Sequence, residues 1–317
     1  MKKITLLLIA MAMIAGNAQH NSNLPETSKG PNIPYDKGYL VEEINNDLYW
    51  VTDGLYNAIF LVYDQGVVMV DAPPTIGENL LAAIKDVTNK PVTHLVYTHS
   101  HTDHIGAAAL FPKDIEIIAQ EETKKILEAR NDDRRPVPTL TFEKNYELKI
   151  GGQHLQLDYH GKNHMDGNIF VYAPKQKVLM LVDIIFPGWV PFKNLGIAED
   201  VPAYMKAHDI ALDYDFETFV AGHVTRLGNR EDVEVSKAFV TDLKNTCQQA
   251  FGKVDFMESA QETGFEDKWM MYNTYFEKVV DVATKEMHGK WMGKLGGLDT
   301  YLRDDVWKMC ESLSVDF

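Results

Sequence analysis

Cysteine is scarce in this chain: Cys247 and Cys310 are the two examples among 317 residues. In an oxidising compartment they could form a disulfide, which would stabilise the fold by about 4 kcal/mol in the chain-entropy model. Two free, buried thiols are the alternative, because the sequence does not fix the distance between their Cα atoms.

Long hydrophobic runs are also few, and one of them begins the chain. Two lysines precede this short apolar run, and small residues precede Gln19, a pattern typical of a secretory signal peptide over residues 1–18. The run is too short for a retained membrane anchor, and no cysteine follows it as in a lipoprotein. We therefore expect a periplasmic or secreted protein with no stable membrane insertion after the signal peptide is removed.

Positive charge is the third deficit. The chain has 31 lysines and arginines against 46 aspartates and glutamates, which gives a formal net charge of −15. Binding to phosphates requires clustered basic side chains, so this balance excludes nucleic acid as an expected partner. A small-molecule substrate is the expectation that remains.

Histidine is concentrated in one short motif, His99-Ser100-His101-Thr102-Asp103-His104. A β-branched apolar run, residues 91–98, precedes it and predicts a buried strand, while the Ala-rich residues 105–110 predict the start of a helix. On the extended segment, His99 and His101 project to the same side, and Asp103 and His104 follow the bend, where they can face a second ion. Imidazole and carboxylate groups converging on one strand-to-helix turn suit zinc.

The H-x-H-x-D-H pattern resembles the signature of the metallo-β-lactamase superfamily, in which it follows a strand of an αββα sandwich and binds one or two metal ions. The resemblance covers roughly residues 40–224 and implies further ligands at later strand ends. A Gly-flanked turn, an apolar strand ending in a carboxylate and a Gly-His step supply them: His164, Asp183 and His223. His160 is a nearby rival of His164, but it does not match the family spacing.

The resemblance also implies how the ligands divide. His99, His101 and His164 would form one metal site, and Asp103, His104 and His223 the second, with Asp183 bridging both. Two Zn²⁺ ions per chain are therefore the expected cofactors. Asp103 is the expected catalytic residue, because it would hold the nucleophile and pass its proton to the leaving group. Asp71, which ends an earlier strand, is expected either to support the metal loop or to cap a turn.

Chemically, this arrangement predicts a dinuclear zinc hydrolase in which a metal-bridging hydroxide attacks a small ester, lactone, thioester or amide. Hydrolysis of β-lactams is the alternative, although Asp183, His104 and Phe186 stand where one β-lactamase subclass has cysteine, arginine and lysine. Phe186, with Trp189 and Phe192, is expected either to line an apolar pocket or to pack within a loop.

Two other classes of function fit these residues less well. An iron-dependent oxidoreductase of this superfamily would carry glutamate in place of His101. A non-catalytic zinc-binding protein would close its site with four ligands, whereas seven are predicted here. The histidine at position 101 and the seven predicted ligands therefore favour the hydrolase over these two classes.

The remaining patterns predict the organisation of the chain. Residues 19–38, rich in Asn, Pro, Ser and Gly, are expected to form a flexible N-terminal arm. Strand and amphipathic-helix patterns over residues 39–230, together with the resemblance, predict an α+β fold, a four-layer αββα metallo-β-lactamase-type sandwich. Residues 231–317 are expected to form a helical C-terminal extension. It would pack on the sandwich, make a homodimer contact or add an aromatic wall to the substrate site.

Overall fold

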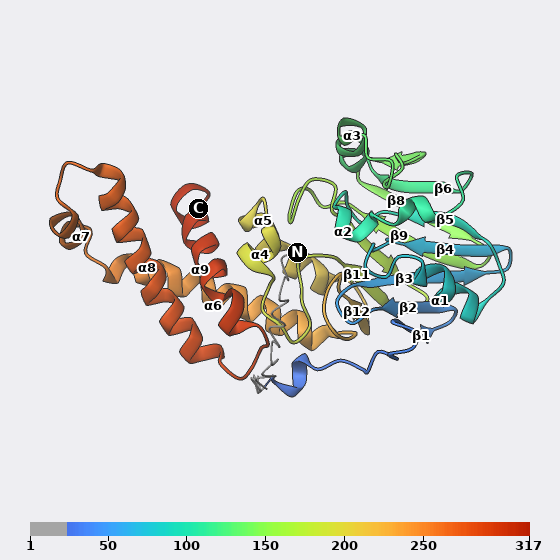
Figure 1. Cartoon of the computed structure of the whole chain (residues 1–317), viewed down its shortest axis with the longest axis horizontal. Coiled ribbons are helices and arrows are strands. Elements are labelled where there is room, and N and C mark those ends of the chain that lie inside the picture. Colours follow the sequence, from blue (N-terminus) through green and yellow to red (C-terminus); the bar gives the residue numbers. More distant parts are fainter. Residues whose placement is uncertain (1–23) are drawn as a thin grey trace, which may run out of the picture.

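The computed structural model describes residues 24–317 (Figure 1). The expected signal peptide, residues 1–18, lies outside the described residues. Between residues 24 and 317, no helix has both the length and the apolar character needed to span a bilayer.

Two β-sheets form the centre of the molecule. The first has seven strands in the order β1 (Leu40–Asn45), β2 (Leu48–Thr52), β3 (Asn57–Tyr63), β4 (Gly66–Val70), β5 (Val92–Val96), β6 (Glu116–Gln120) and β7 (Leu140–Phe142). The second has five, in the order β12 (Thr218–Val220), β11 (Val178–Leu181), β10 (Phe170–Ala173), β9 (Gln153–Asp158) and β8 (Asn145–Ile150). Strands β4 to β7 run parallel to one another, as do β11 and β12.

The alternation of side chains along these strands explains why both sheet faces are buried. In β3, Ile59 and Leu61 contribute to the core between the sheets, while Phe60 and Val62 contribute to the core on the opposite face. Successive side chains of a strand point to opposite faces, so a strand that is apolar throughout must be covered on both sides. The continuous run of β-branched and aromatic residues in β3 therefore requires a layer of helices outside the sheet.

Helices supply these outer layers (Figure 1). On the first sheet they are α1 (Asn79–Val87), α2 (Thr102–Ile105), the short 3₁₀ turn η2 (Ala108–Leu110) and α3 (Glu121–Arg130). The second sheet is covered from α4 (Lys193–Ile197) and α5 (Val201–Asp213) onward. The prediction of an α+β, four-layer αββα sandwich is confirmed.

The predicted helix over residues 105–110 is wrong in length. α2 ends at Ile105, and Gly106 follows it as the C-terminal cap. Alanine favours a helix and glycine does not. Moreover, the backbone N–H of Ala107 donates to the carbonyl of Ala72, at the end of β4, with an N···O distance of 2.9 Å. This tertiary hydrogen bond replaces the bond that would have continued the helix.

Four helices form the C-terminal extension: α6 (Arg230–Lys253), α7 (Phe256–Thr263), α8 (Lys268–Trp291) and α9 (Leu298–Val315). Figure 1 shows α7 and α8 reaching away from the sandwich, with α6 and α9 nearer to it. Phe276 and Trp291 of α8 lie in the same hydrophobic core as the outer face of the second sheet. The extension is therefore helical, as predicted, and it is packed on the sandwich.

The two cysteines lie in this core as free, buried thiols, Cys247 on α6 and Cys310 on α9. Contact with the Cys310 thiol, together with burial, raises the pKa of Cys247 far above its ordinary value. Both sulfur atoms thus pack as small apolar groups between two helices of the extension.

The N-terminal arm is anchored in its described part. Residues Glu26–Ser28 form a 3₁₀ turn, η1, and the Ser28 side chain is fully buried. The carbonyl of Ser28 accepts hydrogen bonds from Trp189 Nε1 at 2.9 Å and from Thr225 Oγ1 at 2.7 Å. Ser28, within the predicted N-terminal arm, therefore contacts the loop after β11 and the segment after β12.

His208 provides a test of the packing between α5 and α6. Its buried ring donates from Nδ1 to the carbonyl of Tyr204 at 3.1 Å, and Nε2 lies 3.0 Å from the Ser236 hydroxyl. Burial lowers the pKa of His208 to about 4. The unfolded chain therefore binds a proton at this position between about pH 6.5 and 4, where the native protein does not, so stability falls as the pH falls through this window.

We expect the free energy of unfolding to lose up to about 3 kcal/mol from this group between pH 6.5 and 4. Urea unfolding at several pH values should show a flatter pH dependence for His208→Gln than for the wild type. His288→Gln, which changes an exposed histidine, should keep the wild-type slope. Equal slopes for His208→Gln and the wild type would contradict this account.

Candidate metal centre

The seven predicted ligands meet at one edge of the sandwich, at or just beyond the carboxyl ends of strands. His99 and His101 follow β5, and α2 carries Asp103 and His104. The other three come after β9, β11 and β12 respectively: His164, Asp183 and His223. The carboxyl ends of the parallel pairs β4–β5 and β11–β12 lie at this edge, which is why residues distant in sequence converge there.

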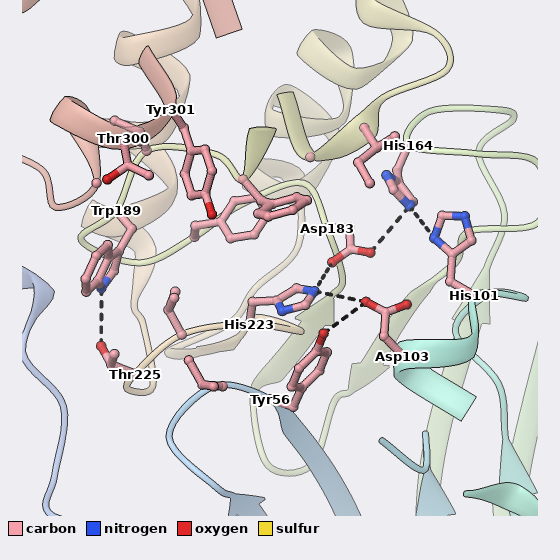
Figure 2. A pocket seen from close by; sticks show the side chains of 18 of the residues that line it. Tyr56, His101, Asp103, His164, Asp183, Trp189, His223, Thr225, Thr300 and Tyr301 are labelled. Carbon is pink, nitrogen blue, oxygen red and sulfur yellow. Dashed lines mark hydrogen bonds and ion pairs between the residues drawn. The ribbon is translucent and has the colours of Figure 1, made fainter. Parts of the chain in front are cut away.

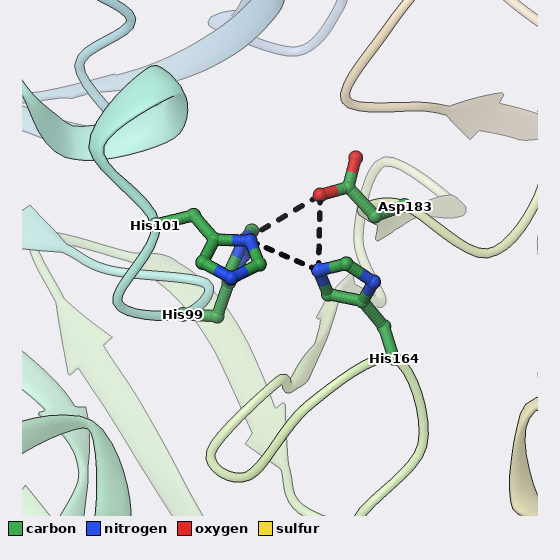
Figure 3. A group of neighbouring side chains, drawn as sticks. All are labelled: His99, His101, His164 and Asp183. Carbon is green, nitrogen blue, oxygen red and sulfur yellow. Dashed lines mark hydrogen bonds and ion pairs between the residues drawn. The ribbon is translucent and has the colours of Figure 1, made fainter. Parts of the chain in front are cut away.

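The side chains form two adjoining groups. In the first, ligand atoms of His99, His101, His164 and Asp183 all lie within 4.8 Å of one another (Figure 3). In the second, the same limit holds for Asp103, His104 and His223. The structure thus brings the seven predicted residues together, with Asp183 grouped with His99, His101 and His164.

Asp183 lies between the two groups. Its Oδ2 atom is 3.3 Å from Nε2 of His164 and 3.2 Å from Nε2 of His104, and its Oδ1 atom is 3.0 Å from Nε2 of His223. Burial alone would raise the pKa of this carboxyl, but the imidazoles, His104 foremost, hold it well below its ordinary value. Asp183 is therefore a buried carboxylate anion that contacts both groups.

The protonation states of the first group suit metal binding. Burial lowers the pKa of His99 well below its ordinary value, lowers that of His101 to about 4 and lowers that of His164 as well. Neutral imidazole is the form that binds a metal. For His104, burial acts in the same direction, but the attraction of Asp183 prevails and raises the pKa to about 9. A metal in the second group would have to displace that proton.

His99 gives the sharpest test of whether a metal fits. Asp71 accepts hydrogen bonds from the backbone N–H of Thr98 at 2.8 Å and from its hydroxyl at 2.7 Å. Because the Thr98 hydroxyl donates to Asp71, its oxygen accepts from Nδ1 of His99, at 3.1 Å. The proton is thereby fixed on Nδ1, and Nε2 keeps its lone pair. This Nε2 atom is buried and has no hydrogen-bond partner among the described residues.

An unpaired buried nitrogen is costly unless something binds it. The chain of Asp71, Thr98 and His99 resembles the outer-shell hydrogen bonding that orients metal-binding histidines. Of the two roles that the sequence left open for Asp71, the geometry supports the ligand loop. The residues present therefore fit a metal ion.

A cavity of about 750 Å³ opens over the two groups (Figure 2). Phe186, Trp189 and Phe192 all line it, so the pocket role that the sequence left open for them is the one observed. Asp103 Oδ2 accepts a hydrogen bond from the Tyr56 hydroxyl at 3.3 Å. Burial, reinforced by Asp103, raises the pKa of Tyr56 to about 12, so this hydroxyl stays a donor at neutral pH.

Among the lining residues that sequence reasoning missed are Tyr56, Thr300 and Tyr301. Tyr56 lies in the turn before β3, and the others belong to the extension, where no motif marks them. His160, the rival of His164, lies outside both groups and pairs instead with the Tyr214 hydroxyl at 2.9 Å.

Comparison with known proteins agrees with this geometry. The model of the Metallo-beta-lactamase superfamily matches residues 51–223, which include all seven residues. The chain therefore belongs to the metallo-β-lactamase superfamily. A metallo-beta-lactamase from Pontibacter korlensis shares the fold, with a TM-score of 0.55 and 23% identity over 63% of this chain and 97% of that one.

Two relatives with described activities are similar in sequence. The 2,4-dinitroanisole O-demethylase subunit alpha of Nocardioides sp. (strain JS1661) is 29% identical over 63% of this chain, which spans 62% of that relative's length. A type 2 metallo-beta-lactamase of Elizabethkingia meningoseptica is 30% identical over 58% of this chain and 78% of its own. Neither alignment covers the full length of this chain.

Asp71→Asn tests the hydrogen-bonded chain behind His99. An amide would present Nδ2 to the Thr98 hydroxyl, which must then accept rather than donate. The hydroxyl proton would turn to Nδ1 of His99 and force the other proton onto Nε2, the atom that should bind the metal. We expect zinc affinity to fall about 10–100-fold, measured by competition with a chromogenic chelator.

Asp86→Asn is the matched control, because Asp86 is a partly exposed acid that bonds Lys37 and Tyr39 away from the site. It should bind zinc as the wild type does. Unchanged zinc affinity in a folded Asp71→Asn protein would show that Asp71 does not set the state of His99.

Proposed function

We propose that the protein is a metal-dependent hydrolase that holds two zinc ions. His99, His101 and His164 would bind one ion, and Asp103, His104 and His223 the other, with Asp183 contacting both. The observation that supports this most strongly is the position of Asp183. Its Oδ2 atom lies 3.3 Å from His164 of the first group and 3.2 Å from His104 of the second, and its Oδ1 atom lies 3.0 Å from His223. A structural site closed by four ligands would not need this second group.

Zinc ions in such a site supply a nucleophile at neutral pH by lowering the pKa of bound water, and they stabilise charge on a substrate oxygen. The chain itself supplies proton transfer. The Asp103 side chain is 43% exposed to the pocket, against 7% for Asp183, so Asp103 can accept a proton and pass it to a leaving group. Tyr56 orients this carboxylate through its hydrogen bond.

A small ester, lactone, thioester or amide is the substrate class that we favour. Among the described residues that line the pocket, Arg130 is the one lysine or arginine, and it is exposed on α3. The ring of the buried Phe186 stacks on the ring of His223, with their centroids 6.0 Å apart. An apolar side chain therefore lies beside the ligand groups. The carboxylate of a β-lactam would find no basic side chain at the position of Phe186. We therefore rank β-lactam hydrolysis second.

Cleavage of an activated aryl methyl ether is a further candidate. The similarity to the 2,4-dinitroanisole O-demethylase subunit favours it, as does the apolar lining of the pocket. Such a cleavage also needs an activated water and a group that receives its proton, so the same side chains would serve it.

One panel of substrates tests the proposal. Zinc-loaded protein would be assayed with an aryl ester, an acyl-homoserine lactone, a thioester, a cephalosporin and 2,4-dinitroanisole. We expect hydrolysis of at least the aryl ester or the lactone. His99→Ala should lower kcat/KM by more than the roughly 10–100-fold cost of losing an outer-shell partner, and bound zinc should fall with it.

His288→Ala makes the same change at an exposed histidine of α8 and should leave activity and zinc content unchanged. Retention of full zinc and activity by His99→Ala would refute the ligand assignment. Two bound zinc ions with no turnover of any substrate would refute the hydrolase and direct attention to iron loading.

A further inference from the structure

The substrate pocket has two walls that come from different parts of the chain. Figure 2 shows Asp103, Asp183 and His164 at one side and Trp189, Thr300 and Tyr301 at the other. The second side combines the loop after β11 with α9 of the C-terminal extension. The extension is thus part of the pocket as well as part of the core.

Tyr301 lies in the first turn of α9, and its hydroxyl points toward the interior of the pocket (Figure 2). Its ring meets that of Phe192 edge to face, with centroids 5.1 Å apart. Trp189 and Phe186 line the same cavity, so four aromatic rings contribute to its surface. Planar groups are the ligands that offset and edge-to-face contacts favour.

This wall is held in place by backbone contacts between the extension and the loop after β11. The N–H of Gly296 donates to the carbonyl of Gly188 at 2.9 Å, and the N–H of Val190 donates to the carbonyl of Gly296 at 3.0 Å. A Cβ atom at Gly296 would lie 2.8 Å from the Trp189 ring, so the ring packs directly on the backbone of the extension.

A further contact joins α9 to the left-handed turn within α4 that packs against Asp183. The buried carboxyl group of Asp305, whose pKa burial raises well above its ordinary value, accepts a hydrogen bond from the N–H of Leu195 at 2.7 Å. Leu195 and Gly196 both have left-handed backbone, and a Cβ at Gly196 would lie 2.6 Å from the carbonyl oxygen of Asp183. Tyr301 and Asp305 lie one helical turn apart, so the same helix fixes the aromatic wall and the turn over the ligands.

From these contacts we propose that Tyr301 is a specificity-determining residue, and that the pocket seats a neutral aromatic group of the substrate against the wall formed by Tyr301, Phe192 and Trp189. The proposal rests on the proposed hydrolase function, because the reacting group must reach the ligand side. The near absence of lysine and arginine from the lining favours a neutral ring over an anionic one.

Calorimetry with two probes of similar shape tests this directly. 2-Naphthol is planar and aromatic, and decahydro-2-naphthol is its saturated counterpart with the same hydroxyl. For zinc-loaded wild type we expect 2-naphthol to bind several-fold more tightly. Tyr301→Ala should weaken 2-naphthol about tenfold and change the binding of the saturated probe little, because aromatic contacts contribute beyond the buried area.

Tyr301→Phe keeps the ring and should bind 2-naphthol within about twofold of the wild type. Tyr301→Leu keeps apolar volume without the ring and should behave as Tyr301→Ala does, which covers a failure of the alanine variant to fold. Trp269→Ala changes an aromatic residue of α8 that is 83% exposed, and it should have no effect. Equal affinity of the two probes for the wild type, or wild-type affinity in Tyr301→Leu, overturns the proposal.

Hydrolysis of 2-naphthyl acetate by the same proteins separates this inference from the proposed function. If esters are hydrolysed and KM is unchanged in Tyr301→Leu, the inference fails while the hydrolase stands. If 2-naphthol binds in a Tyr301-dependent manner but no substrate is turned over, the hydrolase fails while the aromatic subsite stands. If both stand, KM should rise about tenfold in Tyr301→Leu, with kcat changed much less.

Discussion

The carboxylate of Asp183 is the interaction on which the rest of the site depends. It is a buried anion with imidazoles on both sides, and without them its burial would be prohibitive. Burial, reinforced by the neighbouring imidazoles, lowers the pKa of His99, His101 and His164, which favours their neutral forms. The attraction of Asp183 raises the pKa of His104 to about 9, so a proton on His104 offsets the buried anion. The metal ions proposed above would supply this positive charge instead.

The fold brings these groups together through the ends of its strands. Asp71 follows β4 and Asp183 follows β11, and both have left-handed backbone with φ of 62°. Such a conformation is unusual for a residue other than glycine and turns the chain sharply at the strand end. One turn thereby presents a ligand to the site, and the other presents the acceptor that orients His99. The hydrophobic layers on both faces of each sheet hold these turns at a common edge.

The H-x-H-x-D-H turn is a local pattern that could be read directly from the sequence. The four-layer sandwich and the later residues His164, Asp183 and His223 were predicted from the family resemblance that this turn carries, together with strand and turn patterns at the expected places. The sequence could not place Tyr301, because no local pattern relates the start of α9 to the loop that carries Trp189. The alanine content of residues 105–110 predicts a helix. In the structure a hydrogen bond from Ala107 to Ala72, which the sequence does not reveal, ends the helix instead. The anchoring of Ser28 was missed for the same reason.

The central claim is that Asp183 joins two metal sites in one centre. Metal analysis of zinc-loaded protein after dialysis, for the wild type and for Asp183→Asn, tests it most directly. The account predicts about two zinc ions per wild-type chain and a loss of both ions, not of one, in the variant, because each group relies on the same carboxylate. Wild-type zinc content in a folded Asp183→Asn protein would contradict the account.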